Sequence, residues 1–250
     1  MCSSDLLKQD RFSLKTEFAH NFGKAESADS TYKDVFHTGY LVYLDADYVL
    51  GKVAPSFAFL LCSGNKVTED MAAEQAITLT SARNRAFSYF SPLNNFLDDS
   101  VSSSQSEIRP IVAMGTGYGL NYGLARPCTF AASDFDNLIM PSVGLKIACT
   151  EKLTLDIDGY YLISFERGVC LLNSQPRYLS GELGYEADIS LDFQASEHLL
   201  ISFLGGCFLP GKFYREERDD TAGSILSPYV RGDGKADPAY QIELACELKF

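Results

Sequence analysis

Carboxylate side chains recur at spacings of two and four residues along this sequence, and such pairs could carry acid–base chemistry. Asp156 and Asp158 form one pair, and Glu182 and Glu186 form another. In an extended strand both members of each pair point the same way, a spacing that could suit acid–base catalysis by two carboxyl groups. The same spacing recurs in several other segments, which favours a generally acidic wall over one catalytic centre. We therefore predict that the chain is not an enzyme, with a hydrolase as the alternative.

Other residue types that carry catalysis or bind metals are scattered. The sequence contains neither HExxH nor GxSxG, and its three histidines are His20, His37 and His198. Its seven cysteines include no CxxC pair, which argues against a zinc site. Most of them are expected to be thiols that pack as small hydrophobic groups. The cysteines are Cys2, Cys62, Cys128, Cys149, Cys170, Cys207 and Cys246. We predict no metal and no cofactor.

The charge and hydropathy of the chain argue against nucleic-acid binding and against transmembrane helices. The 250 residues carry a formal net charge of −12, which argues against nucleic acid because phosphates need a basic surface. The mean hydropathy is −0.05, and no run of 18 apolar residues occurs, so no transmembrane helix is expected. Membrane β-barrels remain compatible with these values, because alternating strands average to neutral hydropathy.

The dominant pattern along the chain is alternation of apolar and polar residues with a period of two, which is typical of β-strands. Several of these segments are longer than the usual strand of a globular sheet. They predict an all-β protein with about eight antiparallel strands. The segments are 12–18, 40–48, 56–64, 143–148, 153–163, 179–194, 198–208 and 240–250.

The connections between these segments alternate between long and short. Short turns occur at GKVAP, TEK and SEH, whereas the intervening connections are long, and the longest spans about 66–138. Tight turns on one side and long loops on the other are typical of outer-membrane barrels. We therefore predict an antiparallel transmembrane β-barrel over 10–250, after an N-terminal tail at 1–9. The loop 66–138 is expected to be extracellular or folded into the lumen.

In such a barrel the apolar residues of each strand face lipid and the intervening residues face the lumen. A wall of carboxylates prefers cations or neutral solutes, and the alternative is a solvated wall with no role in recognition. The predicted lumen residues are Lys15, Glu17, Asp45, Asp47, Lys146, Asp156, Asp158, Glu182, Glu186, Asp188, Asp192, Glu243 and Glu247. Basic residues of the long loop could form a constriction, and these are Arg83, Arg85, Arg109 and Arg126.

Four stretches together resemble the alginate-export family of outer-membrane porins. They are TGYLVYLDADYVLGKVAPSFAFLLCSGN, FSYFSPLNNF, LGYEADISLDFQASEHLLISFLGGCFLPGKFY and AYQIELACELKF. Within the third, an aromatic-x-Pro-Gly-x-aromatic step matches at Phe208, Pro210, Gly211 and Phe213. The resemblance covers roughly 38–250 and corresponds to the C-terminal half of such a porin. Export of an anionic polysaccharide would suit a basic pore, and the acidic wall of this chain departs from that.

The resemblance implies a bacterial outer-membrane location, contact with lipid, and recognition of the final Phe250 by the barrel-assembly machinery. Family members have some 16 to 18 strands, so the strands here either close alone or form the second half of a larger barrel. MCSSDLLKQD does not read as a signal peptide, so the chain is either cytosolic or lacks an upstream segment.

We expect a porin-like channel for passive transport of small hydrophilic solutes or ions. One alternative is a soluble, lipocalin-like barrel that binds a small molecule, with apolar faces inside and acids outside. The other is a structural or adhesive surface barrel, or a non-functional fragment, with acidic loops at 24–37 and 212–237 facing a partner.

Overall fold

A computed structural model provides the fold of the chain. It describes residues 2–25, 35–64, 83–84, 129–131, 134–167, 169–172, 175–216 and 235–248. No helix among these residues is long and apolar enough to cross a membrane.

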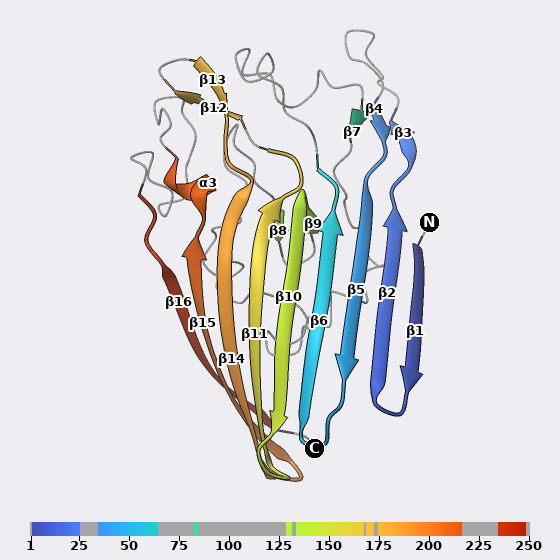
Figure 1. Cartoon of the computed structure of the whole chain (residues 1–250), viewed down its shortest axis with the longest axis vertical. Coiled ribbons are helices and arrows are strands. Elements are labelled where there is room, and N and C mark those ends of the chain that lie inside the picture. The colour runs from blue at the N-terminus through green and yellow to red at the C-terminus, as the bar shows by residue number, and fades with distance from the viewer. Residues whose placement is uncertain are drawn as a thin grey trace.

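The main element is one twisted and curved sheet of nine antiparallel strands (Figure 1). The strands follow one another across the sheet in chain order, so each pairs with its neighbours along the sequence. The prediction of an all-β, antiparallel fold is confirmed, and each of the eight predicted segments corresponds to a strand. The nine strands are β1 (Cys2–Gln9), β2 (Phe12–His20), β5 (Tyr40–Tyr48), β6 (Val53–Cys62), β10 (Leu138–Ala148), β11 (Leu153–Ser164), β14 (Glu182–Ser196), β15 (Leu199–Pro210) and β16 (Ala239–Leu248).

The ninth strand is β1, which occupies the segment predicted as an N-terminal tail at 1–9. It pairs with β2 from Cys2↔Ala19 to Gln9↔Phe12, and a two-residue turn joins the strands. Its sequence, CSSDLLKQ, does not alternate cleanly, which is why periodicity alone missed it. Pairing with β2 supplies the ladder hydrogen bonds that the local pattern does not indicate. Among the described strands, β1 and β16 form the two edges of the sheet.

Short and long connections lie at opposite ends of the sheet, as predicted. The turns after β1, β5, β10 and β14 have two to four residues, and Figure 1 shows them at the bottom. The remaining connections at the top carry small elements, and most of the predicted loop 66–138 lies outside the described residues. The small elements are β3 (Gly23–Ala25), β4 (Val35–His37), β7 (Arg83–Asn84), β8 (Thr129–Ala131), β9 (Asp134–Asp136), β12 (Val169–Leu172), β13 (Gln175–Tyr178) and α3 (Lys212–Arg215).

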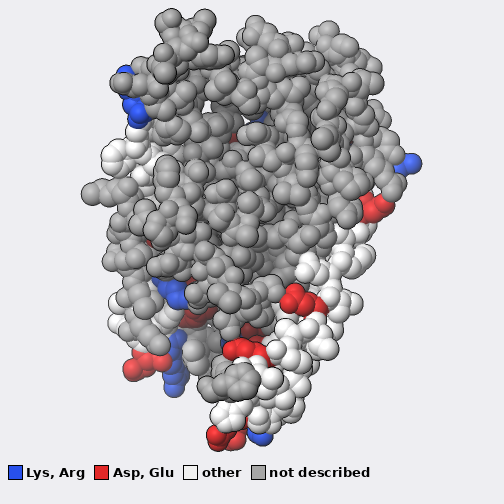
Figure 2. Space-filling view, turned by 180° about the vertical axis from the view of Figure 1, so that it is seen from behind, with Lys and Arg blue, Asp and Glu red and all other residues white. Residues whose placement is uncertain are grey.

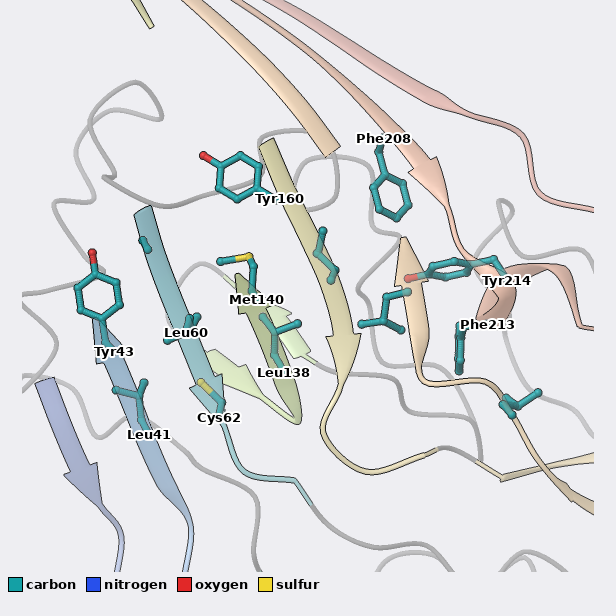
Figure 3. Close-up of a cluster of buried hydrophobic side chains, with 14 of the residues drawn as sticks. Leu41, Tyr43, Leu60, Cys62, Leu138, Met140, Tyr160, Phe208, Phe213 and Tyr214 are labelled. Atoms are coloured by element: carbon teal, nitrogen blue, oxygen red, sulfur yellow. The ribbon is translucent and has the colours of Figure 1, made fainter. Parts of the chain in front are cut away.

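Alternation along the strands gives the sheet two different faces. One face, which we call the exposed face, carries large apolar side chains in contact with the surroundings, among them Phe18, Phe57, Val143, Ile157, Tyr185, Ile189, Phe193, Ile242 and Leu244. The other, the buried face, combines acidic residues with the main hydrophobic cluster. Figure 3 shows part of that cluster, with Leu41, Leu60, Leu138 and Met140 on adjacent strands.

A bulge at the start of β14 changes which residues face which way. The β11–β14 register shifts between Leu162 and Ile163, so that Ile163 lies opposite Glu182. Gly184 adopts φ +146°, a conformation that side-chain-bearing residues rarely reach. As a result Leu183, predicted on the lipid-facing side by simple alternation, is fully buried. Leu179, before the strand begins, is also fully buried and corrects the same prediction.

The bulge is held by the Pro210-Gly211 step at the end of β15. The Gly211 N–H donates to the Leu183 carbonyl at 2.8 Å, and a Cβ at Gly211 would meet the Glu182 carbonyl oxygen at 2.5 Å. Just beyond, Tyr214 packs edge-on against Phe208 and Phe213, with ring centroids 6.1 and 5.0 Å away. The step therefore brings two backbones together and covers them with aromatic rings.

Replacement of Gly184 by alanine should lower the free energy of unfolding by about 2–3 kcal/mol. Its Cβ would meet the Leu209 carbonyl oxygen and the Phe208 ring, and the positive φ adds strain. The matched control is Gly159→Ala on β11, where a Cβ would meet Val143 Cγ2 at an ordinary 3.8 Å. Urea unfolding in detergent micelles, followed by circular dichroism, measures both. Equal losses for the two variants would contradict this account of the bulge.

Candidate functional site

The candidate site is the acidic part of the buried face. Antiparallel partners share a face, so the register of the sheet shows which predicted lumen residues lie together. One row of successive partners runs Lys15, Asp45, Ala58, Ser142, Tyr160 and Glu186 across six strands. The row below it runs Ser13, Asp47, Ser56, Gly144, Asp158, Asp188, Gly206 and Gln241. The sheet thus gathers charges that lie far apart in the sequence.

Twelve of the thirteen predicted lumen residues share this face by register. Six of them belong to the two rows above. The other six lie an even number of residues from a row member on the same strand, and they are Glu17, Lys146, Asp156, Asp192, Glu243 and Glu247. The exception is Glu182, which the bulge places opposite Ile163 at the long-connection end. Its carboxylate lies 3.7 Å from Lys212 Nζ instead. Ten acids and two lysines remain on the buried face, and we call this set the acidic wall.

Four carboxylates of the acidic wall are nearly inaccessible. The exposed fractions are 8% for Glu17, 7% for Asp45, 3% for Glu186 and 8% for Asp188. A buried carboxylate is costly unless it has polar partners. Lys15 Nζ lies 3.9 Å from Asp45 Oδ2, and Glu186 and Asp188 also have interaction partners. The fold therefore retains several negative charges where apolar side chains would cost less.

One ion pair of the acidic wall joins Lys146 and Asp156. Their Nζ and Oδ2 atoms are 3.0 Å apart, and the two residues are direct partners across β10 and β11. Asp158 follows two residues later on the same side of β11. Lys146 is thus the local counter-ion for a stretch of the wall that is otherwise acidic. Figure 2, seen from behind, shows Lys or Arg and Asp or Glu side chains near one another toward the lower end of the molecule.

Asp158 and Asp188 face each other directly across β11 and β14. Like charges at directly opposed positions destabilise a sheet. Glycines flank this pair along the row, and a Cβ on Gly144 would meet Asp158 Oδ1 and Ser56 Oγ. Gly144 therefore leaves the space that the Asp158 carboxylate occupies. This arrangement places two carboxylates side by side between small residues.

Sequence reasoning identified the charges but missed the residues between them. Ser56, Gly144, Gly206 and Tyr160 belong to the same rows, yet each is an ordinary strand residue in its own segment. Only the register across strands brings them beside the carboxylates. In the part of the chain that the structure describes, no three His, Cys, Asp or Glu side chains form a group that could hold a metal ion.

Of the residues predicted for the basic constriction and the terminal signal, only Arg83 is among the described residues. Arg83 lies in β7, whose backbone pairs in parallel with Phe36 of β4. Arg85, Arg109, Arg126 and Phe250 lie outside the described residues. Their roles as a loop constriction and an assembly signal stay predictions.

Comparison with known proteins gives weak structural similarity. No family model matches the chain, and no curated protein matches it. The CymD monoaromatic hydrocarbon channel is 11% identical with a TM-score of 0.39, and 100% of this chain is covered. The toluene transporter TbuX of Ralstonia pickettii is 9% identical with a TM-score of 0.33, and 99% is covered. The chain spans 64% of the length of each. Its all-β class rests on its own strand ladders.

Replacement of Lys146 by glutamine should lower the free energy of unfolding by about 0.5–1 kcal/mol at low ionic strength. Asp156 loses its ion pair, and the neighbouring carboxylates lose a cation. The difference should shrink in concentrated salt, which screens the repulsion. The control is Lys212→Gln, because its pair with Glu182 is longer, at 3.7 Å against 3.0 Å, and lies outside the acidic wall, so its loss should be smaller. Urea unfolding at two salt concentrations compares them, and the same loss for both variants would count against the acidic wall as an electrostatic unit.

Proposed function

We propose that this chain is an outer-membrane β-barrel channel that lets small hydrophilic solutes, cations above all, diffuse passively. The observation that carries this proposal is the inverted distribution of polarity. Glu186 is 3% exposed, whereas Ile189 three residues later is 44% exposed, and Ile242 on β16 is 76% exposed. In water, large apolar side chains over so many strands would be unfavourable, and in a lipid bilayer they are the required surface.

The arrangement of the connections supports the same proposal. Four tight turns lie at one end of the sheet and all long connections lie at the other. Membrane barrels have this asymmetry, with the tight turns on the periplasmic side. An outer-membrane location, contact with lipid and recognition by the barrel-assembly machinery are parts of the proposal.

The soluble, lipocalin-like alternative requires the opposite polarity. A barrel of that kind would bury Ile189 and its neighbours and expose the acids. Asp45 and Asp188 are instead 7% and 8% exposed. The distribution of burial therefore favours a membrane barrel over a soluble binding barrel. A surface barrel without transport shares the two faces, and ion conductance separates it from a channel.

The charge of the acidic wall favours cations and neutral solutes over anions. Ten carboxylates against two lysines would repel a polyanion such as alginate. We therefore propose kinship with alginate-export porins for the barrel, and not for the substrate. The two solved structures are a monoaromatic hydrocarbon channel and a toluene transporter, and a similarity this weak does not carry those substrates to this chain.

Single-channel recording of the refolded chain in a planar bilayer tests this function. An asymmetric KCl gradient should give discrete steps and a reversal potential that shows a preference for K⁺. The double substitution Asp158→Asn with Asp188→Asn should lower the cation-to-anion permeability ratio by a factor of roughly two to three, as for a Coulomb energy below 1 kcal/mol in a hydrated lumen.

The control for charge is Asp10→Asn, in the two-residue turn between β1 and β2 and away from the acidic wall. It should leave the permeability ratio unchanged. A protein that inserts without conducting would support the surface barrel. Channels that prefer chloride, or a ratio that the double substitution does not move, would refute the acidic wall as the selective element.

A further inference from the structure

The exposed face is uncharged over five successive rows where β11 and β14 pair, and then becomes charged. The rows are Leu153 with Phe193, Leu155 with Leu191, Ile157 with Ile189, Gly159 with Ala187, and Tyr161 with Tyr185. Beyond them Leu183 and Gly184 are both buried, so Glu182 is the next β14 side chain on the exposed side, opposite Ile163. The bulge therefore ends the apolar rows with a carboxylate.

Glu182 meets a counter-ion at this level. Its Oε2 atom lies 3.7 Å from Lys212 Nζ, and the lysine side chain is 76% exposed. Lys212 begins α3, which follows β15 and lies next to β14 (Figure 1). An ion pair is thus held just past the point where the apolar rows stop. Charged side chains are costly in the hydrocarbon of a bilayer and are tolerated near its interfaces.

The last apolar row is a pair of tyrosines. The Tyr161 and Tyr185 rings stack with their centroids 4.6 Å apart and an interplanar angle of 12°, and Leu209 of β15 lies opposite Tyr185. The Tyr185 side chain is 48% exposed. A tyrosine combines an apolar ring with a polar hydroxyl, so it favours the boundary between hydrocarbon and headgroups. The order along the strands is therefore apolar residues, then tyrosines, then charges.

The height of the apolar rows fits one bilayer. Leu153 and Tyr161 are eight residues apart. At about 3.3 Å per residue this separation gives about 26 Å along β11. A strand tilt of about 40° reduces it to about 20 Å, to which the side chains of the end rows add, against about 25 Å for the apolar band of a membrane barrel. The row of Ile157 and Ile189 then lies at the middle of the bilayer.

We propose that Tyr161, Tyr185, Glu182 and Lys212 form a headgroup anchor, a surface that binds the polar headgroup layer of the leaflet at the long-connection end. The anchor rests on the proposed function, because it requires the exposed face to contact lipid. The tyrosines occupy the boundary, and the ion pair stays among the headgroups. Together they fix the depth at which this end of the sheet lies. The bulge serves the anchor, since regular alternation would have turned Glu182 toward the acidic wall.

The depths of three positions on β14 test the anchor. Single tryptophans are introduced by Tyr185→Trp, Ile189→Trp and Phe193→Trp into a chain that has no other tryptophan. Phosphatidylcholine bilayers carry bromine on the acyl chains, either near the headgroup or near the chain end. Positions 185 and 193 should be quenched about twofold more strongly by the shallow bromines, and position 189 about twofold more strongly by the deep ones, because these rows lie at the borders and the middle of the apolar band.

The ion pair is tested in the Tyr185→Trp chain. Removal of both charges by Glu182→Leu with Lys212→Leu should let this end of the sheet sink into the hydrocarbon. Quenching of position 185 by the deep bromines should then rise by about 1.5-fold or more. The matched control exchanges the charges, by Glu182→Lys with Lys212→Glu, and should keep the depth of the parent. Heat-modifiable mobility in gel electrophoresis reports whether each variant is folded.

The outcomes separate the anchor from the function on which it rests. A shallow, deep, shallow order along β14, with a rise in deep quenching only in the leucine variant, would support the anchor. Deep quenching at position 185 as strong as at position 189, or equal depth in the leucine and exchanged variants, would overturn the anchor and leave the membrane barrel intact. No quenching at any of the three positions would overturn the contact with lipid, and with it both the anchor and the proposed function.

Discussion

The structure depends on a single constraint, which is that alternate residues of a strand point to opposite sides of the sheet. In nine paired strands this period of two separates large apolar side chains from buried carboxylates. A register slip of one residue in β2, β5, β11 or β14 would place acids among the exposed apolar groups. The acidic wall, the hydrophobic cluster and the exposed face are therefore consequences of one register, and none of them can shift alone.

The register departs from that alternation at both ends of β14: one shift lies between Gln194 and Ser196, next to a short turn, and the other lies where β14 begins, next to the long connections. The bulge at Gly184 moves Leu183 into the hydrophobic cluster and takes Glu182 out of the acidic wall. The Gly211 step and the rings of Phe208 and Tyr214 hold this geometry. At the start of β14 the regular pairing stops, and side chains of the hydrophobic cluster pack together. The acidic wall occupies the regular part, where a ladder can hold charges in rows.

The sequence predicted the eight regular strands, the class of the fold and the face of twelve charged residues, because all three follow from periodicity. It did not predict β1, whose residues show little alternation and which is a strand because β2 pairs with it. Nor could it place Leu183 or Glu182, since a bulge depends on the partner strand and on a positive φ at Gly184. The row that joins Gly144 to Asp158, and the row that joins Leu41 to Leu138 through Cys62, require the register across strands.

The central claim is that the exposed face contacts lipid acyl chains while the buried face does not. The chain contains no tryptophan, so single tryptophans introduced by Ile189→Trp, Leu244→Trp and Tyr160→Trp report on one position each. In bilayers whose lipids carry bromine on the acyl chains, fluorescence from positions 189 and 244 should be strongly quenched. Fluorescence from position 160, on the buried face, should be nearly unaffected. Unquenched fluorescence at 189 and 244, or equal quenching at all three positions, would contradict a membrane-spanning sheet with this orientation.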